Sequence, residues 1–151
     1  MTTGPQVLRT LLHLPLPEQR LLARALFVVW MIRLVLWLLP LRAVRQLVSR
    51  VTRASRRAGP QSRLPATRIV WAVSAAGRFV PAPTCLSQAL AAQVMLGRNG
   101  YPVRLRIGVA KDRSGTLEAH AWLEDQGSVV FGELAGFSRF TALPPLEAAG
   151  S

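Results

Sequence analysis

The sequence of 151 residues has few acids, one cysteine and two histidines. Between Gln19 and Lys111 there are 16 basic residues and no Asp or Glu, and the formal net charge is +12. A field of one sign favours an acidic partner, which is a nucleic acid, an anionic membrane, or an acidic peptide or protein. The net charge therefore predicts that the partner is negatively charged, but it does not predict which class of partner it is.

The shortage of thiols and imidazoles excludes some kinds of site. Cys85 alone cannot form an internal disulfide, and with His13 and His120 it falls short of an ordinary structural zinc set. We therefore expect no metal and no other cofactor. Residues 1–20 lack the pattern of a signal peptide, and nothing demands an oxidising compartment, so a cytoplasmic location is expected, with membrane association as an option.

Half of the residues are hydrophobic, which is enough for a packed core in a chain of one-domain length. Helical patterns come first and strand patterns follow, which predicts an α+β fold with a small antiparallel sheet. Residues 59–65 have the composition of a linker. We therefore expect an apolar, then arginine-rich helical arm with its linker at 1–64, a domain at 65–145 and a flexible tail at 146–151.

The first part of the arm is predicted to be an apolar helix that begins near Pro17 and ends at Pro40. A membrane span needs about 20 apolar residues. The run at 25–41 is slightly short and carries Arg33 at its middle, which costs about 3 kcal/mol or more in lipid. A helix buried against the domain or a partner is therefore favoured over a span.

Residues 42–57 predict a basic amphipathic helix. Its arginine face either is solvated and covers the core, or docks an anionic membrane or protein. The segment lacks interleaved aromatic residues, which argues against nucleic acid.

The expected domain holds two more helices and then strands. Thr67 and Thr84 are placed to cap helices that run to about residues 79 and 98. Strands are expected at about 103–109, 117–124 and 128–133, with turns at 112–115 and 125–127.

A cysteine that opens a helix, followed by a histidine on a strand, is a common layout for a nucleophile and its base. At the helix start, the dipole and unpaired amides favour a thiolate at Cys85 and can donate to an oxyanion. His120 would take the thiol proton. The alternative is that Cys85 is a small buried hydrophobe and His120 is structural. His13 has no partner in view and is expected at the surface.

A third group is needed to hold the imidazole in the correct tautomer. If the turn after the histidine strand has two residues, His120 lies directly opposite Glu133. If the loop has three residues, Gly132 faces His120 and Glu133 points away unless a bulge intervenes. Glu124 shares the face of His120 and is the other candidate, whereas Asp125 is expected to be a turn residue.

Four blocks of sequence carry a resemblance to a known family. They are 84–93 (TCLSQALAAQ), 100–109 (GYPVRLRIGV), 120–124 (HAWLE) and 139–144 (RFTALP). Together they resemble the transglutaminase-like (papain-like) cysteine peptidases of lasso-peptide biosynthesis, the stand-alone peptidase half of the split B protein. The resemblance covers about residues 65–145 and implies Cys85 as nucleophile and His120 as base. The family usually has Asp after the next strand, where this chain has Glu133.

The resemblance also implies a function and partners. The enzyme would remove the leader peptide from a ribosomally made lasso-peptide precursor in antibiotic biosynthesis. The implied partners are the leader region of the precursor, a separate leader-recognition protein and an ATP-dependent macrolactam synthetase, the lasso cyclase. Residues 1–64 lack the pattern of a fused leader-recognition domain, so recognition is expected in trans. The arginine-rich arm is expected to dock that partner or an acidic part of the leader.

Two alternatives stay open. The first is a non-catalytic basic adaptor that binds an anionic membrane, nucleic acid or a partner protein, with peripheral membrane contact through residues 25–57. The second is acyl transfer to an amine in place of water, which would use the same Cys85 and His120. The favoured peptidase hypothesis expects no nucleic acid as a partner.

Overall fold

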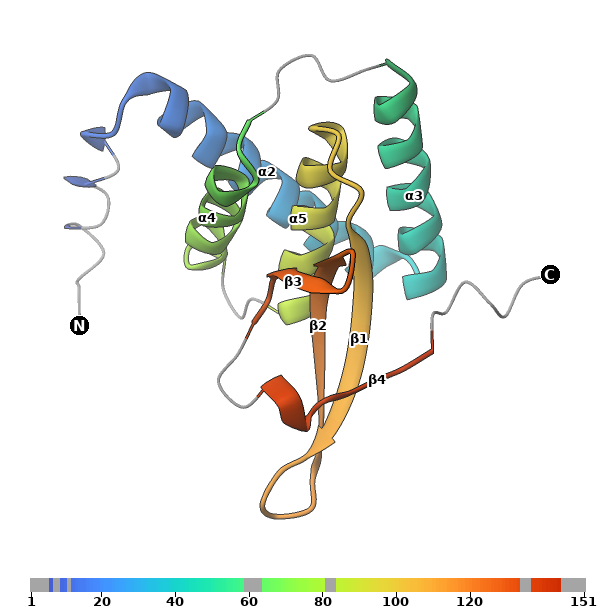
Figure 1. Cartoon of the computed structure of the whole chain (residues 1–151). Helices are drawn as coiled ribbons and strands as arrows, with labels where there is room; N and C mark the ends of the chain where they lie inside the picture. Colours follow the sequence, from blue (N-terminus) through green and yellow to red (C-terminus); the bar gives the residue numbers. More distant parts are fainter. Residues whose placement is uncertain are drawn as a thin grey trace.

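The computed structural model describes residues 6, 9–10, 12–58, 64–80, 84–133 and 137–144. Its helices α2 (Leu16–Leu38), α3 (Leu41–Ala58), α4 (Ala66–Gly77) and α5 (Cys85–Arg98) precede a four-stranded antiparallel sheet. Figure 1 shows the helices gathered at one end of the molecule, with the sheet extending away from them. The predicted α+β class is confirmed. Residues 59–63 of the expected linker at 59–65, part of the lead-in before residue 12 and the tail at 146–151 lie outside the described residues.

The sheet has the order β3-β2-β1-β4. Strands β1 (Arg104–Lys111) and β2 (Leu117–Asp125) form a long hairpin, β3 (Ser128–Phe131) pairs with β2, and β4 (Thr141–Ala142) pairs with β1. The first three strands confirm the sequence pattern, but β3 ends two residues earlier than expected. The short β4 was not predicted, because two residues are too few to show an alternation.

Proline positions explain two of the helix boundaries. A proline lies in the first turn of α2, and the helix ends just before Pro40, where the Leu39 N–H still donates to the Val35 carbonyl at 2.8 Å. The prediction that Thr67 caps α4 is wrong. Pro65 takes the cap position without any side-chain hydrogen bond, and its fixed φ suits the entry to the helix.

Helix α5 lies at the centre of the molecule and contacts α2, α3, α4, β1 and β2. The buried residues of α5 are Ser87, Ala89, Leu90, Ala91, Ala92, Met95, Leu96 and Gly97. At helical spacing they occupy all sides of the helix, so neighbouring elements must cover it all round. Val29 of α2 and Val44 of α3 belong to the same core cluster. The expected boundary near residue 64 therefore separates elements that share one core.

Helix α2 is long and apolar enough to cross a membrane by length and composition alone, yet 28% of its apolar window is buried. The buried residues are Leu21, Leu22, Ala25, Val29 and Ile32. They form one stripe at helical spacing, and α2 packs with it against α4 and α5. One side of α2 therefore belongs to the core, whereas the opposite side is exposed.

The β1–β2 turn is held by Asp112, as the sequence predicted for this segment. Its Oδ1 accepts from the Ser114 hydroxyl at 2.6 Å, from the Ser114 N–H at 2.8 Å and from the Thr116 N–H at 2.9 Å. The hydroxyl bond and then the Thr116 amide hold the pKa of Asp112 below its usual value.

The central place of α5 predicts a large effect of truncating its side chains. Leu96 is fully buried, so Leu96→Ala should lower the free energy of unfolding by about 2–5 kcal/mol. Leu117 is 65% exposed, and Leu117→Ala should change it by less than about 0.5 kcal/mol. Urea titration followed by circular dichroism measures both. Equal effects would contradict the central position of α5.

Candidate active site

The first turn of α5 is fixed by two hydroxyl side chains. Thr84 is the N-cap, as predicted, and its Oγ1 accepts from the Ser87 N–H at 3.2 Å. The buried Ser87 Oγ donates back to the Thr84 carbonyl at 2.9 Å. The Thr84 Oγ1 bond is the N-cap itself, whereas the Ser87 hydroxyl bonds back to a carbonyl three residues earlier, as serine often does within a helix. A cap of this kind stabilises a helix by about 1 kcal/mol, and here it sets the position of the next residue, Cys85.

Cys85 is the first residue of α5 and is half-buried. The first amides of any helix have no hydrogen-bond partner within the helix, and they lie at the positive end of its dipole. An oxyanion that forms beside Cys85 can therefore accept from these amides.

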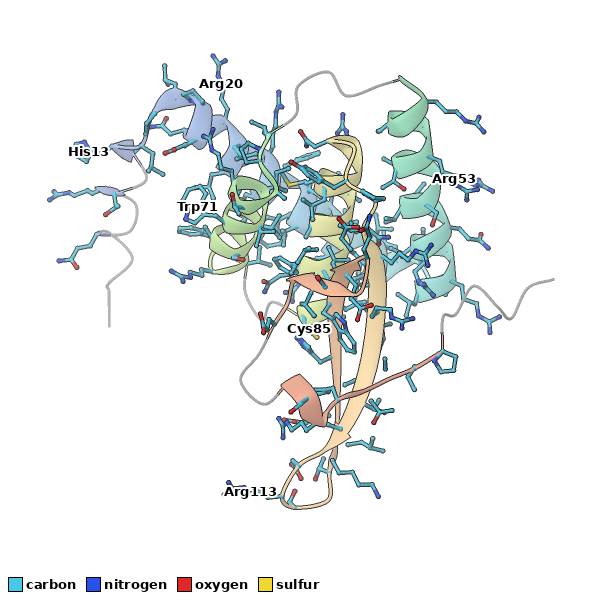
Figure 2. The ribbon with its side chains drawn as sticks, in the orientation of Figure 1. His13, Arg20, Arg53, Trp71, Cys85 and Arg113 are labelled. Atoms are coloured by element: carbon cyan, nitrogen blue, oxygen red, sulfur yellow. The ribbon has the colours of Figure 1, made fainter. Side chains whose placement is uncertain are left out.

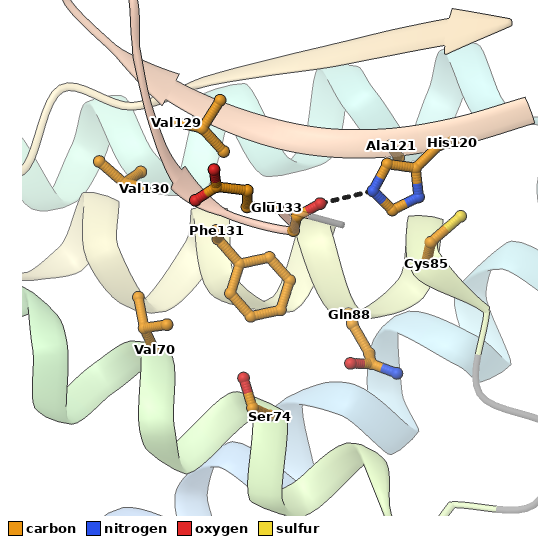
Figure 3. A pocket seen from close by; sticks show the side chains of 11 residues that line it. Val70, Ser74, Cys85, Gln88, His120, Ala121, Val129, Val130, Phe131 and Glu133 are labelled. Carbon is orange, nitrogen blue, oxygen red and sulfur yellow. Dashed lines mark hydrogen bonds between the residues drawn. The ribbon is translucent and has the colours of Figure 1, made fainter. Parts of the chain in front are cut away.

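His120 lies on β2, and its side chain is buried. Its Nε2 is 2.6 Å from the carbonyl oxygen of Gly132. A carbonyl oxygen only accepts, so Nε2 carries the proton and donates it. The lone pair of neutral His120 is therefore on Nδ1. Figure 3 shows the sulfur of Cys85 on the side of the His120 ring opposite the dashed hydrogen bond.

The Gly132 carbonyl reaches the ring because the β2–β3 pairing is irregular. The turn has the two residues Gln126 and Gly127, which both have positive φ. The register then shifts between Glu124, opposite Val129, and Leu123, opposite Phe131. The pairing does not continue to His120, so the direct count from His120 to Glu133 does not hold. Instead Gly132, at φ 89°, turns the chain at the end of β3.

The three carboxylates considered from the sequence lie in different surroundings. Glu133 is exposed and lines the pocket, and Figure 3 shows its carboxylate pointing away from the His120 ring. Glu124 accepts from the Trp122 indole N–H at 2.8 Å and pairs with Arg106 at 3.3 Å. Asp125 is the strand residue that precedes the turn.

Aromatic rings enclose His120. The Trp122 ring stacks at 6.2 Å between centroids, and the Phe140 ring lies at 5.5 Å. Phe140 is carried there by the pairing of β4 with β1 and by Arg139, whose guanidinium bonds to Glu118 at 2.6 Å. The late block of the sequence thus closes one side of the histidine. An apolar wall of this kind strengthens the hydrogen bond between His120 and the Gly132 carbonyl.

Cys85 and His120 line one pocket of about 560 Å³ (Figure 3). The rest of its lining is Val70, Ser74, Gln88, Ala121, Val129, Val130, Phe131, Gly132 and Glu133. Ser74 and Gln88 add hydrogen-bonding groups to this lining, and neither was predicted as a site residue from the sequence. Gln88 follows Cys85 by three residues, and that spacing on a helix signals a shared face.

Two further predictions from the sequence concern His13 and metal binding. His13 is exposed at the surface, away from the pocket, as Figure 2 shows. Among the residues that the structure describes, no group of three or more His, Cys, Asp or Glu side chains is arranged to hold a metal ion.

Cys85 at the start of a central helix and His120 on the adjoining sheet, both in one pocket, are placed as the nucleophile and base of papain-like cysteine enzymes are. The model of the transglutaminase-like superfamily matches residues 28–144, which is more than half of the chain, and the protein belongs to this superfamily. Its members are commonly cysteine peptidases or transferases. The match begins inside α2, so it takes in most of the arm. No curated protein and no solved structure matches the chain.

Because the Gly132 carbonyl bonds directly to His120, a backbone change at Gly132 should alter the site. An added Cβ at Gly132 would lie 3.0 Å from the Ala121 carbonyl oxygen, in a backbone conformation that disfavours side chains. Gly132→Ala should move the carbonyl, loosen His120 and slow alkylation of Cys85 about tenfold at neutral pH. Iodoacetamide labelling across a pH series measures this.

Gly115 provides the matched control. It has φ 85° and nothing within 4 Å of an added Cβ, so Gly115→Ala carries the same backbone strain without the contact. Both variants should lose about 1–2 kcal/mol of stability. Equal labelling rates in the two variants would contradict a role of Gly132 in holding His120.

Proposed function

We propose that the protein is a cysteine peptidase that removes the leader peptide from a lasso-peptide precursor. One observation carries the chemistry: Cys85 at the capped start of α5 and His120, with its proton held on Nε2, line the same pocket. The choice of substrate is supported by the resemblance of four sequence blocks to the leader peptidases. The proposed partners are the leader region, a separate leader-recognition protein and the ATP-dependent lasso cyclase.

Acylation uses the two residues in turn. Nδ1 of His120 takes the thiol proton, and the Cys85 sulfur attacks the carbonyl carbon of the scissile bond. As the S–C bond forms, the electron pair of the carbonyl moves onto its oxygen, which accepts from the first amides of α5. The C–N bond then breaks, and His120 gives its proton to the leaving amine. A thioester at Cys85 remains.

Deacylation repeats the pattern with water. His120 removes a proton from a water molecule, and the resulting hydroxide attacks the thioester carbon. The C–S bond breaks, the peptide leaves with a new carboxyl group, and the thiol of Cys85 is restored. An amine in place of water would give acyl transfer through the same thioester, and the masses of the products separate the two outcomes.

Precursor cleavage, with the leader-recognition protein supplied, tests the proposal. Wild type should release leader and core peptides with the mass of one added water. Cys85→Ala and His120→Ala should each lower kcat by at least about a thousandfold, because the two groups act as a unit. His13→Ala is the matched control and should cleave like wild type, since His13 is exposed outside the pocket. Full activity of Cys85→Ala would end the proposal.

The group that orients His120 is the subject of a separate prediction. Glu133 remains the residue that matches the family pattern, but the imidazole bonds to the Gly132 carbonyl. Glu133→Gln should therefore lower kcat/KM less than tenfold, because it leaves that bond in place. Glu124→Gln, whose carboxylate bonds to Trp122 and Arg106, is the comparison and should behave similarly. A loss with Glu133→Gln as large as with His120→Ala would assign the third role to its carboxylate.

A further inference from the structure

Helix α2 has an exposed stripe opposite its buried one. Following the helix at spacings of three and four residues, the exposed side chains run from two arginines into large apolar residues. They are Arg20, Arg24, Phe27, Trp30, Met31, Leu34, Trp37 and Leu38. We call this set the α2 stripe. Trp37 is 82% exposed and Phe27 is 63% exposed.

The α2 stripe has the composition of a surface that enters the boundary of a lipid bilayer. Its apolar part holds aliphatic side chains and two tryptophans, whose rings favour the level of the headgroups. Arg20 and Arg24 begin the stripe, and the exposed Arg42 follows the helix at its other end. Long arginine side chains can reach from an apolar boundary to phosphate groups.

Charge complementarity selects an anionic surface as the occupant. No acid lies between Gln19 and Lys111, so no carboxylate of this segment repels an anionic headgroup. Each arginine near such a surface adds to the attraction. We propose that the α2 stripe binds the surface of an anionic membrane, with α2 lying in the plane of the interface.

The buried stripe of α2 explains why the helix lies in the plane and does not span. Ala25 and Val29 are fully buried against the other helices, so a spanning helix would have to leave the core. The exposed apolar part from Phe27 to Leu38 is about 17 Å long at 1.5 Å per residue. That is well short of the bilayer core of about 30 Å. The buried side of α2 and the short length of its exposed apolar part both point to contact with the membrane surface.

Sedimentation with vesicles tests the proposal on the full chain. We expect binding to vesicles of phosphatidylcholine and phosphatidylglycerol in equal parts, little binding to phosphatidylcholine alone, and weakening by salt. Arg20→Gln with Arg24→Gln should weaken binding about thirtyfold. Phe27→Gln with Trp37→Gln should weaken vesicle binding at least tenfold, because the variant loses two apolar side chains that are exposed in the folded chain and would enter the apolar boundary of the bilayer.

Matched controls lie on the β1–β2 hairpin, which projects away from α2, as Arg113 marks in Figure 2. Lys111→Gln with Arg113→Gln removes the same charge from exposed positions, and Leu117→Gln removes an exposed apolar side chain. Circular dichroism checks that all variants are folded. Both controls should bind vesicles like wild type.

Three outcomes would overturn the proposal. Equal weakening by the hairpin charge pair would show attraction by net charge without the α2 stripe. A dimer that Phe27→Gln with Trp37→Gln dissociates, without vesicle binding, would make the stripe an interface between copies of the chain. Loss of leader-recognition protein binding in the same variant, again without vesicle binding, would make it a protein-docking surface. Because vesicle binding needs no chemistry at Cys85, each result stands apart from the cleavage assay.

Discussion

The burial of α5 on every side is the constraint on which the rest of the structure depends. A helix made of alanine, leucine and small residues must be covered by neighbours, and α2, α3, α4 and the sheet supply the cover. Its C-terminal part is then enclosed, whereas its first turn lies at the pocket. The hydroxyls of Thr84 and Ser87 hold that turn, so Cys85 is fixed in position relative to the packed part of the helix.

The orientation of His120 depends on a hydrogen bond to the main chain. In a triad with a carboxylate, a negative charge fixes the tautomer of the imidazole and stabilises its charged form. A main-chain carbonyl fixes the tautomer equally well but brings no charge. Here the first task is done by Gly132, held at the end of β3 by a shifted register and a positive φ. The rings of Trp122 and Phe140 limit the directions in which His120 can move.

Local signals in the sequence predicted most of the elements, and they singled out Cys85 and His120, which the fold brings to one pocket. The Thr84 cap, the apolar alternation of β1 and the Asp112 turn depend on neighbouring residues, so they were visible without the fold. The shift between Glu124 and Leu123 was not, because a bulge is chosen by packing across strands. Pairing of β4 with Gly108 and Val109 is a long-range contact, and a two-residue strand has no period of its own.

The buried and exposed stripes of α2 could not be told apart from the sequence, because both are apolar. Val29 and Trp30 are adjacent and both apolar, yet one is fully buried and the other is 47% exposed. When both faces of a helix are hydrophobic, its periodicity carries no contrast, and only the packing distinguishes the core side from the outer side. An apolar outer side costs solubility unless something covers it. The basic residues near the ends of the stripe are the reason for proposing an anionic membrane surface as that cover, and the buried side of the same helix is the reason for proposing that α2 lies in the plane of the interface.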